Sequence, residues 1–170
     1  MKQITLSIVI LSLFISLCGC GQTSEPNVVM PTVFYYHTDL NSKEDFNDIF
    51  VAEIREGVQY QDDHILLLNS YFAGPESENL VNPFPSGLDA VSLEATGDTA
   101  YVVLSEKIAK LSALDLTMAC SCLSLTLLEL TQCDYVQISA ENNLLADQEF
   151  ITIGRDTLLL SDNTQLPTEN

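Results

Sequence analysis

Several side chains of this chain are of types that could bind a metal ion or catalyse a reaction. Their spacing argues against most of these roles. Asp62, Asp63 and His64 could bind a metal ion, but as the first turn of a helix they more readily cap and solvate it. His37 has no second His or Cys at ligand spacing, and we expect it on the surface at the end of a strand. Ser86 lacks the glycine-flanked elbow of an activated serine, which favours a turn. We therefore predict no catalytic residue, no metal site and no bound cofactor.

The five cysteines have different expected fates. Cys120 and Cys122 lie in a predicted helix about 200° apart around its axis, so their Cβ atoms diverge and a bond between them is not expected. Cys133 completes an odd set within the folded part of the chain, and no disulfide framework emerges. A metal site on the C-x-C pair is an alternative, but its neighbours offer no further ligand. We predict buried, free thiols that pack as small apolar side chains.

Cys20 follows a short positive start and an apolar run over residues 4–18, which is shorter than the roughly 20 residues that span a bilayer as a helix. Leu17-Cys18-Gly19-Cys20 resembles the lipobox of bacterial lipoprotein signals, with Cys18 as a mild departure at the second position. The resemblance implies that residues 1–19 are a lipoprotein signal peptide and that Cys20 becomes a diacylated N-terminus. Acyl chains such as palmitate would hold the protein at the extracytoplasmic face of the membrane. The alternative is an uncleaved anchor helix with buried cysteines.

The charge of the chain is strongly one-sided, with 24 Asp and Glu against 6 Lys and Arg, and a formal net charge of -18. Nucleic acid and anionic lipid both need a basic surface, which argues against direct electrostatic binding to either. With 46% hydrophobic and 18% charged residues, the composition is that of a folded protein. We interpret residues 20–31 as a polar linker, residues 32–160 as a single domain and residues 161–170 as a polar tail.

Apolar periodicity predicts a mixed order of strands and helices in the domain. The segment 49–55 alternates polar Glu53 and Arg55 with apolar neighbours, which favours a strand with one wet face. Residues 62–72 form a predicted helix that Gly74-Pro75 ends. The other predicted strands are 32–37, 88–94, 100–104, 133–138, 150–153 and 157–160, and those at 88–94 and 100–104 form a hairpin around Gly97-Asp98.

A later helix is expected to form the centre of the core. Ser112 and Asp115 have the spacing of a capping box, and residues 116–128 contain no charge. A helix of about 18–20 residues that is apolar nearly all round has to be buried on most of its sides. It therefore fixes where the strands on either side of it in the sequence can pack.

Segments of the domain together resemble the GerMN domain, which is named for sporulation and spore germination proteins. They are the Gly74-Pro75 stop, the Pro85-Ser86-Gly87 loop, the hairpin over residues 91–105 and the late helix with the strand that follows it. The match covers roughly residues 32–140, with a long polar stretch after Tyr36 as a departure. The resemblance implies an α+β fold, with two helices packed on one face of a small mixed β-sheet, similar to ring-building motifs. The resemblance brings no catalytic residues with it. It agrees with the interpretation of Cys20 as the lipidated residue of a lipoprotein.

The sequence thus predicts a non-enzymatic, lipid-anchored protein of the cell envelope. Its GerMN-like domain would bind a protein partner or self-assemble in sporulation, germination or cell-wall-related processes. We expect contact through the sheet face opposite the helices and through exposed strand edges, because free edges pair with other chains. The alternative is an extracytoplasmic lipoprotein that binds a small ligand or a cation, although the D-x-D-x-D-G run of calcium loops is absent from the sequence.

Overall fold

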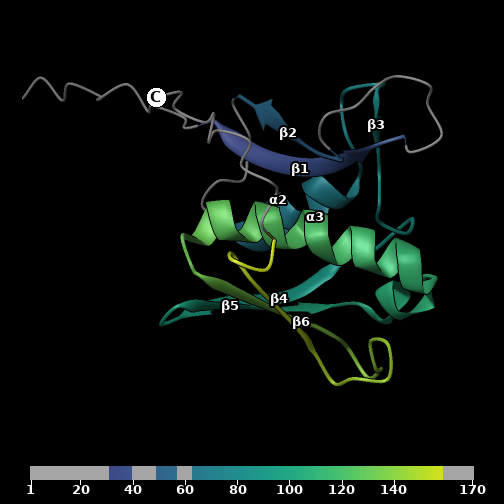
Figure 1. The fold of residues 1–170 in the computed structure, drawn as a ribbon, viewed down its shortest axis with the longest axis vertical. Coiled ribbons are helices and arrows are strands. Elements are labelled where there is room, and N and C mark those ends of the chain that lie inside the picture. Colours follow the sequence, from purple (N-terminus) through teal and green to yellow (C-terminus); the bar gives the residue numbers. More distant parts are fainter. Residues whose placement is uncertain (1–30, 40–48, 57–62, 159–170) are drawn as a thin grey trace, which may run out of the picture.

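The computed structural model describes residues 31–39, 49–56 and 63–158, which form two β-sheets and two α-helices (Figure 1). The predicted α+β class is confirmed. The longer helix, α3 (Ala113–Thr131), lies between strand β1 of one sheet and strands β5 and β6 of the other (Figure 1). The described residues therefore contain a second sheet beside the mixed sheet that the family resemblance implied.

The smaller sheet consists of β1 (Thr32–Thr38), β2 (Phe50–Arg55) and β3 (Leu80–Val81) in the order β2-β1-β3. All of its pairings are antiparallel. The predicted strands at 32–37 and 49–55 are confirmed. The two-residue β3 was not predicted, because a strand this short shows no periodicity.

The larger sheet has the order β4-β5-β6-β7, with bounds β4 (Ala90–Thr96), β5 (Thr99–Leu104), β6 (Tyr135–Ala140) and β7 (Ile151–Gly154). The predicted hairpin is confirmed, and Gly97 takes the positive φ of 65° that its tight turn needs. β5 and β6 are parallel, and α3 lies in the connection between them. The prediction of an extended segment at 157–160 is wrong for residues 157 and 158, which form a turn. Residues 159 and 160 lie outside the described residues.

Helix α3 begins and packs as its sequence predicts. Ser112 is the N-cap, and its hydroxyl accepts a hydrogen bond from the Asp115 backbone N–H and donates one to the Asp115 carboxylate at 2.7 Å. α3 is long and apolar enough to cross a membrane by length and composition, yet it packs against strands of both sheets. Its apolar surface thus serves the core. The buried residues of α3 are Leu116, Ala119, Cys120, Cys122, Leu123, Ser124, Leu125, Thr126, Leu127 and Leu128.

The shorter helix, α2 (His64–Phe72), buries aromatic side chains beneath the smaller sheet. The ring of Tyr71 stacks on Phe34 of β1 with centroids 5.0 Å apart, and it contacts Phe84 edge-on at 4.8 Å. The predicted end of this helix is confirmed, since Gly74 follows it with a φ of 110°. A 3-10 helix, η1 (Glu106–Lys110), leads from β5 towards α3 and was not predicted.

Candidate functional site

The smaller sheet turns an apolar surface away from its buried aromatic side. In the pairing of β1 with β2, Val33 lies opposite Ile54, and Tyr35 lies opposite Ala52. Ile54 is 65% exposed, and Ala52 is also exposed. We term these four residues the apolar face. None of them carries a charge, although the chain contains 24 acidic residues. Exposed apolar area of this kind is typical of a contact surface.

The polar residues of β2 point inward, which is the reverse of the wet face that the sequence predicts. Arg55 is only 8% exposed and forms an ion pair with Glu53 at 2.7 Å. The same guanidinium donates to the backbone carbonyl oxygen of Gly74 at 2.7 Å and to the Tyr36 hydroxyl at 3.0 Å. The strand is therefore confirmed, but its two faces are exchanged, because these buried polar groups find partners far away in the sequence.

The remaining contacts of this ion pair tie β2 to the loop after α2. The guanidinium carbon of Arg55 lies 4.8 Å from the centre of the Phe34 ring, within the range of a cation–π contact. The second oxygen of Glu53 accepts hydrogen bonds from the backbone N–H groups of Glu76 and Ser77, each at 3.0 Å. This network fixes the orientation of β2, and so holds Ala52 and Ile54 outward.

The opposite edge of β1 is closed by side chains of both helices. The Tyr35 backbone N–H donates to the Thr126 hydroxyl of α3 at 2.9 Å. The Tyr71 hydroxyl of α2 donates to the Tyr35 carbonyl oxygen at 2.5 Å. Burial raises the pKa of Tyr71 well above its ordinary value, so its hydroxyl stays a neutral donor at physiological pH. This stretch of β1 is therefore unavailable to another chain.

The strand edges of the two sheets differ in how readily another chain could pair with them. β4 carries a register shift between Ala90 and Ser92, and β7 is only four residues long. Bulges and short strands are features that protect an edge. β2 pairs with β1 in regular register over six residues, and in the described part of the chain it has no strand on its other side. β2 is thus the edge best suited to strand addition.

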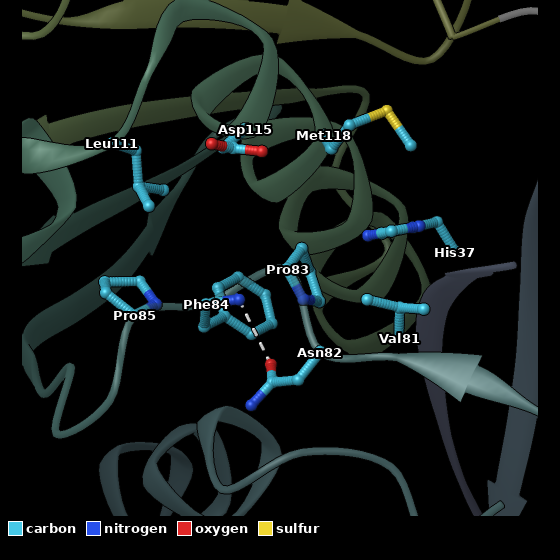
Figure 2. Close-up of a pocket in the computed structure, with 9 residues that line it drawn as sticks. All are labelled: His37, Val81, Asn82, Pro83, Phe84, Pro85, Leu111, Asp115 and Met118. Carbon is cyan, nitrogen blue, oxygen red and sulfur yellow. Dashed lines mark hydrogen bonds between the residues drawn. The ribbon is translucent and has the colours of Figure 1, made fainter. Parts of the chain in front are cut away.

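A small pocket of about 250 Å³ lies between the end of β1, the loop after β3 and the start of α3 (Figure 2). His37 and Asp115 are its ionisable lining residues. Several polar groups of the lining already have partners. Asn82 accepts from the Phe84 backbone N–H at 3.1 Å, and Asp115 accepts from the Ser112 hydroxyl (Figure 2 draws the first of these contacts). Ligand sites of about 300–1,000 Å³ are usual, so this pocket would hold only a small group.

The residues singled out in the sequence do not come together in one site. Cys20 and Asp62 lie outside the described residues. Asp63 is the N-cap of α2 and accepts hydrogen bonds from two backbone N–H groups at 3.1 Å, which confirms the capping role. Ser86 lies in a turn, as predicted, and His37 is the next-to-last residue of β1 and lines the pocket. Among the described residues, no group of three or more His, Cys, Asp or Glu side chains is placed to hold a metal ion.

The described cysteines are buried and free, as predicted. Cys120 and Cys122 lie on α3, and Cys133 lies just after it. Burial raises the pKa of the Cys120 and Cys122 thiols to about 12, so both stay protonated at neutral pH. These thiols therefore act as small apolar side chains of the core rather than as nucleophiles.

Comparisons with known proteins point to one family. The family profile described as "Germane: Sporulation and spore germination" matches residues 32–146, which is more than half of the chain. A search of curated proteins found no match.

A search of solved structures matches, among others, two bacterial proteins. One contains the tandem GerMN domains of the sporulation protein GerM from Bacillus subtilis, with a TM-score of 0.56 and 16% identity. The alignment covers 81% of this chain and 49% of that one, so this chain spans about half the length of the tandem structure. The other is a candidate lipoprotein from Clostridium perfringens, with a TM-score of 0.46, 15% identity, and coverage of 75% of this chain and 89% of that one.

Proposed function

This chain belongs to the Germane family, and from that premise we propose that it is a non-enzymatic envelope protein that binds a protein partner in sporulation, germination or cell-wall-related processes. The observation that carries the proposal is the open edge of β2 beside the apolar face. An incoming strand would pair with the backbone of β2, while its side chains pack on Ile54 and Ala52. The tandem GerMN domains of GerM, from a sporulation protein with the same fold, support the assignment to this process.

The buried ion pair supports a role for β2 in recognition. Charged side chains protect an edge strand when pairing with another chain would bury a charge that has no partner. Here Glu53 and Arg55 are directed into the protein and held by Gly74, Glu76 and Ser77. The exposed side of β2 therefore has no charged side chain that would oppose pairing, although the chain contains 24 acidic residues.

We propose further that the domain is held at the membrane through acyl chains on Cys20. Support comes from the lipobox-like residues before it and from the apolar run over residues 4–18. The strong negative charge would repel an anionic membrane, so attachment through lipid suits this chain better than attachment through charge.

Counting thiols in denaturant tests the lipid anchor. The unprocessed chain has five cysteines, whereas removal of residues 1–19 and acylation of Cys20 leave only Cys120, Cys122 and Cys133 free. We expect three reactive thiols per chain in protein isolated from membranes, together with a mass increase on the peptide that begins at Cys20. Five reactive thiols would show that the chain is neither cleaved nor acylated there.

A substitution on the apolar face tests the protein-binding role. Ile54→Asp should abolish complexes seen by crosslinking and size-exclusion chromatography of the full chain with envelope extract, because a carboxylate would be buried at the contact. A residue at the centre of an interface contributes about 2 kcal/mol or more, so we expect affinity to fall roughly thirty-fold or further. Leu144→Asp is the matched control, since Leu144 is 50% exposed and lies outside this sheet. Equal effects of the two substitutions, or a strict monomer without partners, would contradict the proposal.

The pocket of Figure 2 favours a second candidate, a receptor for a small ligand or cation, because it brings His37 and Asp115 to one hollow. A calcium titration followed by thermal unfolding tests it. A rise in Tm that Asp115→Asn removes would support this function, and an unchanged Tm would exclude calcium as the ligand.

A further inference from the structure

The outer side of the four-stranded sheet differs in chemistry from the apolar face. Ala100, Val102 and Val136 point inward and are buried, so the residues between them point outward. Among the outward residues of these four strands, Glu94 is the only charged one, and most of the rest bear hydroxyl or amide groups. We term this side the hydroxyl face. Its central residues are Thr99, Tyr101, Tyr135, Gln137, Ser139 and Thr152.

Tyr135 on this face leans over the neighbouring strand. It is paired with Gly154 of β7, and a Cβ atom built on Gly154 would lie 2.6 Å from Oδ1 of Asp156, 3.0 Å from Cε1 and 3.1 Å from Cδ1 of the tyrosine ring. The ring thus occupies the space that a side chain at position 154 would take. It remains 42% exposed, and so offers an aromatic surface supported from beneath by backbone.

Tyr101 supplies a second exposed ring on the adjacent strand β5. In the parallel register, Tyr101 lies opposite Gln137 and Thr99 lies opposite Tyr135. The two tyrosines are therefore diagonal neighbours, with Cα atoms roughly 7–8 Å apart by the geometry of paired strands. Tyr101 is 41% exposed. The two exposed rings thus share one face of the sheet, with the amide of Gln137 opposite Tyr101 and the hydroxyl of Thr99 opposite Tyr135.

The charges of the chain restrict what this face can bind. Each Lys and Arg of the described residues already lies within 4.0 Å of a carboxylate: Arg55 with Glu53, Lys107 with Asp89, Lys110 with Glu106, and Arg155 with Glu129. With a net charge of -18, the chain repels polyanions at long range. This repulsion disfavours anionic ligands, and the hydroxyl and amide side chains of the hydroxyl face offer hydrogen bonds to an uncharged one.

We infer that the hydroxyl face binds an uncharged, extended polysaccharide. Sugar rings have apolar C–H faces that stack on aromatic rings, and they have hydroxyl rims that exchange hydrogen bonds with Ser, Thr and Gln side chains. Protein contacts instead centre on apolar area from which serine is depleted, and Val103 is the one aliphatic side chain directed outward from β5 and β6. The inference concerns a different sheet from the protein-binding edge of β2, and it stands independently of that proposal.

Titration of the full chain with chitohexaose and with cellohexaose tests the inference, in a detergent without a sugar headgroup. We expect binding that Tyr101→Ala and Tyr135→Ala each weaken about tenfold, the scale of one aromatic stacking contact. Leu114→Ala is the control, because Leu114 is 65% exposed and lies on α3 rather than on this sheet, and it should leave binding unchanged. Thermal unfolding of each variant confirms that it is folded.

Three results would overturn the inference. The first is the absence of binding to both oligosaccharides. The second is binding that neither tyrosine substitution weakens. The third is crosslinking of a photoreactive residue at position 101 to a protein in cells, which would show that this face binds protein instead. None of these results bears on position 54, so the proposal for β2 can fail or succeed separately.

Discussion

In the three-stranded sheet, strand β2 directs its charged side chains inward and Ala52 and Ile54 outward, whereas the four-stranded sheet buries its apolar side chains and turns hydroxyl groups outward. Both sheets contact the same helix, α3. The difference lies in β2, where Arg55 finds carbonyl, hydroxyl and carboxylate partners inside the protein. A single internal network can thus decide which side of an edge strand meets solvent, and with it which class of ligand the strand can bind.

Removing the arginine of that network should have the largest effect on stability. Arg55→Ala leaves Glu53 buried without its cation, and losing one partner of a buried pair costs about 3–5 kcal/mol of unfolding free energy. Lys110→Ala is the control, since its ion pair with Glu106 is exposed and should contribute only about 0.3–0.5 kcal/mol. Urea unfolding measures both. Similar losses would mean that the inward pair does not stabilise the small sheet.

Substitutions at the closed edge of β1 should have the next largest effect on the free energy of unfolding. Tyr71→Phe removes the donor to the Tyr35 carbonyl oxygen and should cost about 1–3 kcal/mol, because a buried acceptor then loses its hydrogen bond. Thr126→Val should cost a similar amount, since it removes the acceptor for the Tyr35 N–H. Chemical denaturation of each variant checks this. Unchanged stability in both would show that the helices do not close this edge.

On the four-stranded sheet, Gly154→Ala should cost about 1–3 kcal/mol by overpacking, because the added methyl group meets Oδ1 of Asp156 at 2.6 Å and the Tyr135 ring at 3.0 Å. Part of this cost should disappear in the double variant Gly154→Ala/Tyr135→Ala, where the ring is absent. The coupling is measured from the unfolding free energies of the single and double variants. If the changes in unfolding free energy of the two single variants add up to that of the double variant, the position of the Tyr135 ring does not depend on Gly154.

The helix shared by the two sheets gives an effect on stability that is absent at neutral pH and arises only at alkaline pH. The pKa of the Cys120 and Cys122 thiols is raised from 9.0 to about 12, so the fold favours the neutral thiol. Their contribution to stability is complete below pH 9 and is lost progressively as the pH rises from 9 towards 12. Replacing both cysteines by Ala should flatten the pH dependence of the unfolding free energy between pH 9 and 12 and leave the pH dependence below pH 9 unchanged.

Much of the architecture could be predicted because it depends on local sequence. The charge-free run after Ser112 identifies α3, and Gly97 identifies the hairpin, since cap and turn residues act over a few positions. The orientation of β2 could not be predicted in the same way. Alternation shows that a strand has two faces, but it does not show which one is buried when both Arg55 and Ile54 could be exposed.

The candidate surfaces were predictable only in outline. Strand edges and an open sheet face were expected, whereas the unprotected edge at β2 and the support of Tyr135 by Gly154 depend on pairings between distant residues. Lipidation at Cys20 stays a prediction from sequence, since that residue lies outside the described part of the chain.

The most direct test of the central claim is photocrosslinking in cells, with a photoreactive amino acid in place of Ile54 or, for comparison, of Tyr101. Both side chains are exposed and each lies on the outer side of its own sheet. We expect a discrete crosslinked protein complex from position 54 and none from position 101. Complexes from position 101 alone, or no complex from position 54, would contradict it.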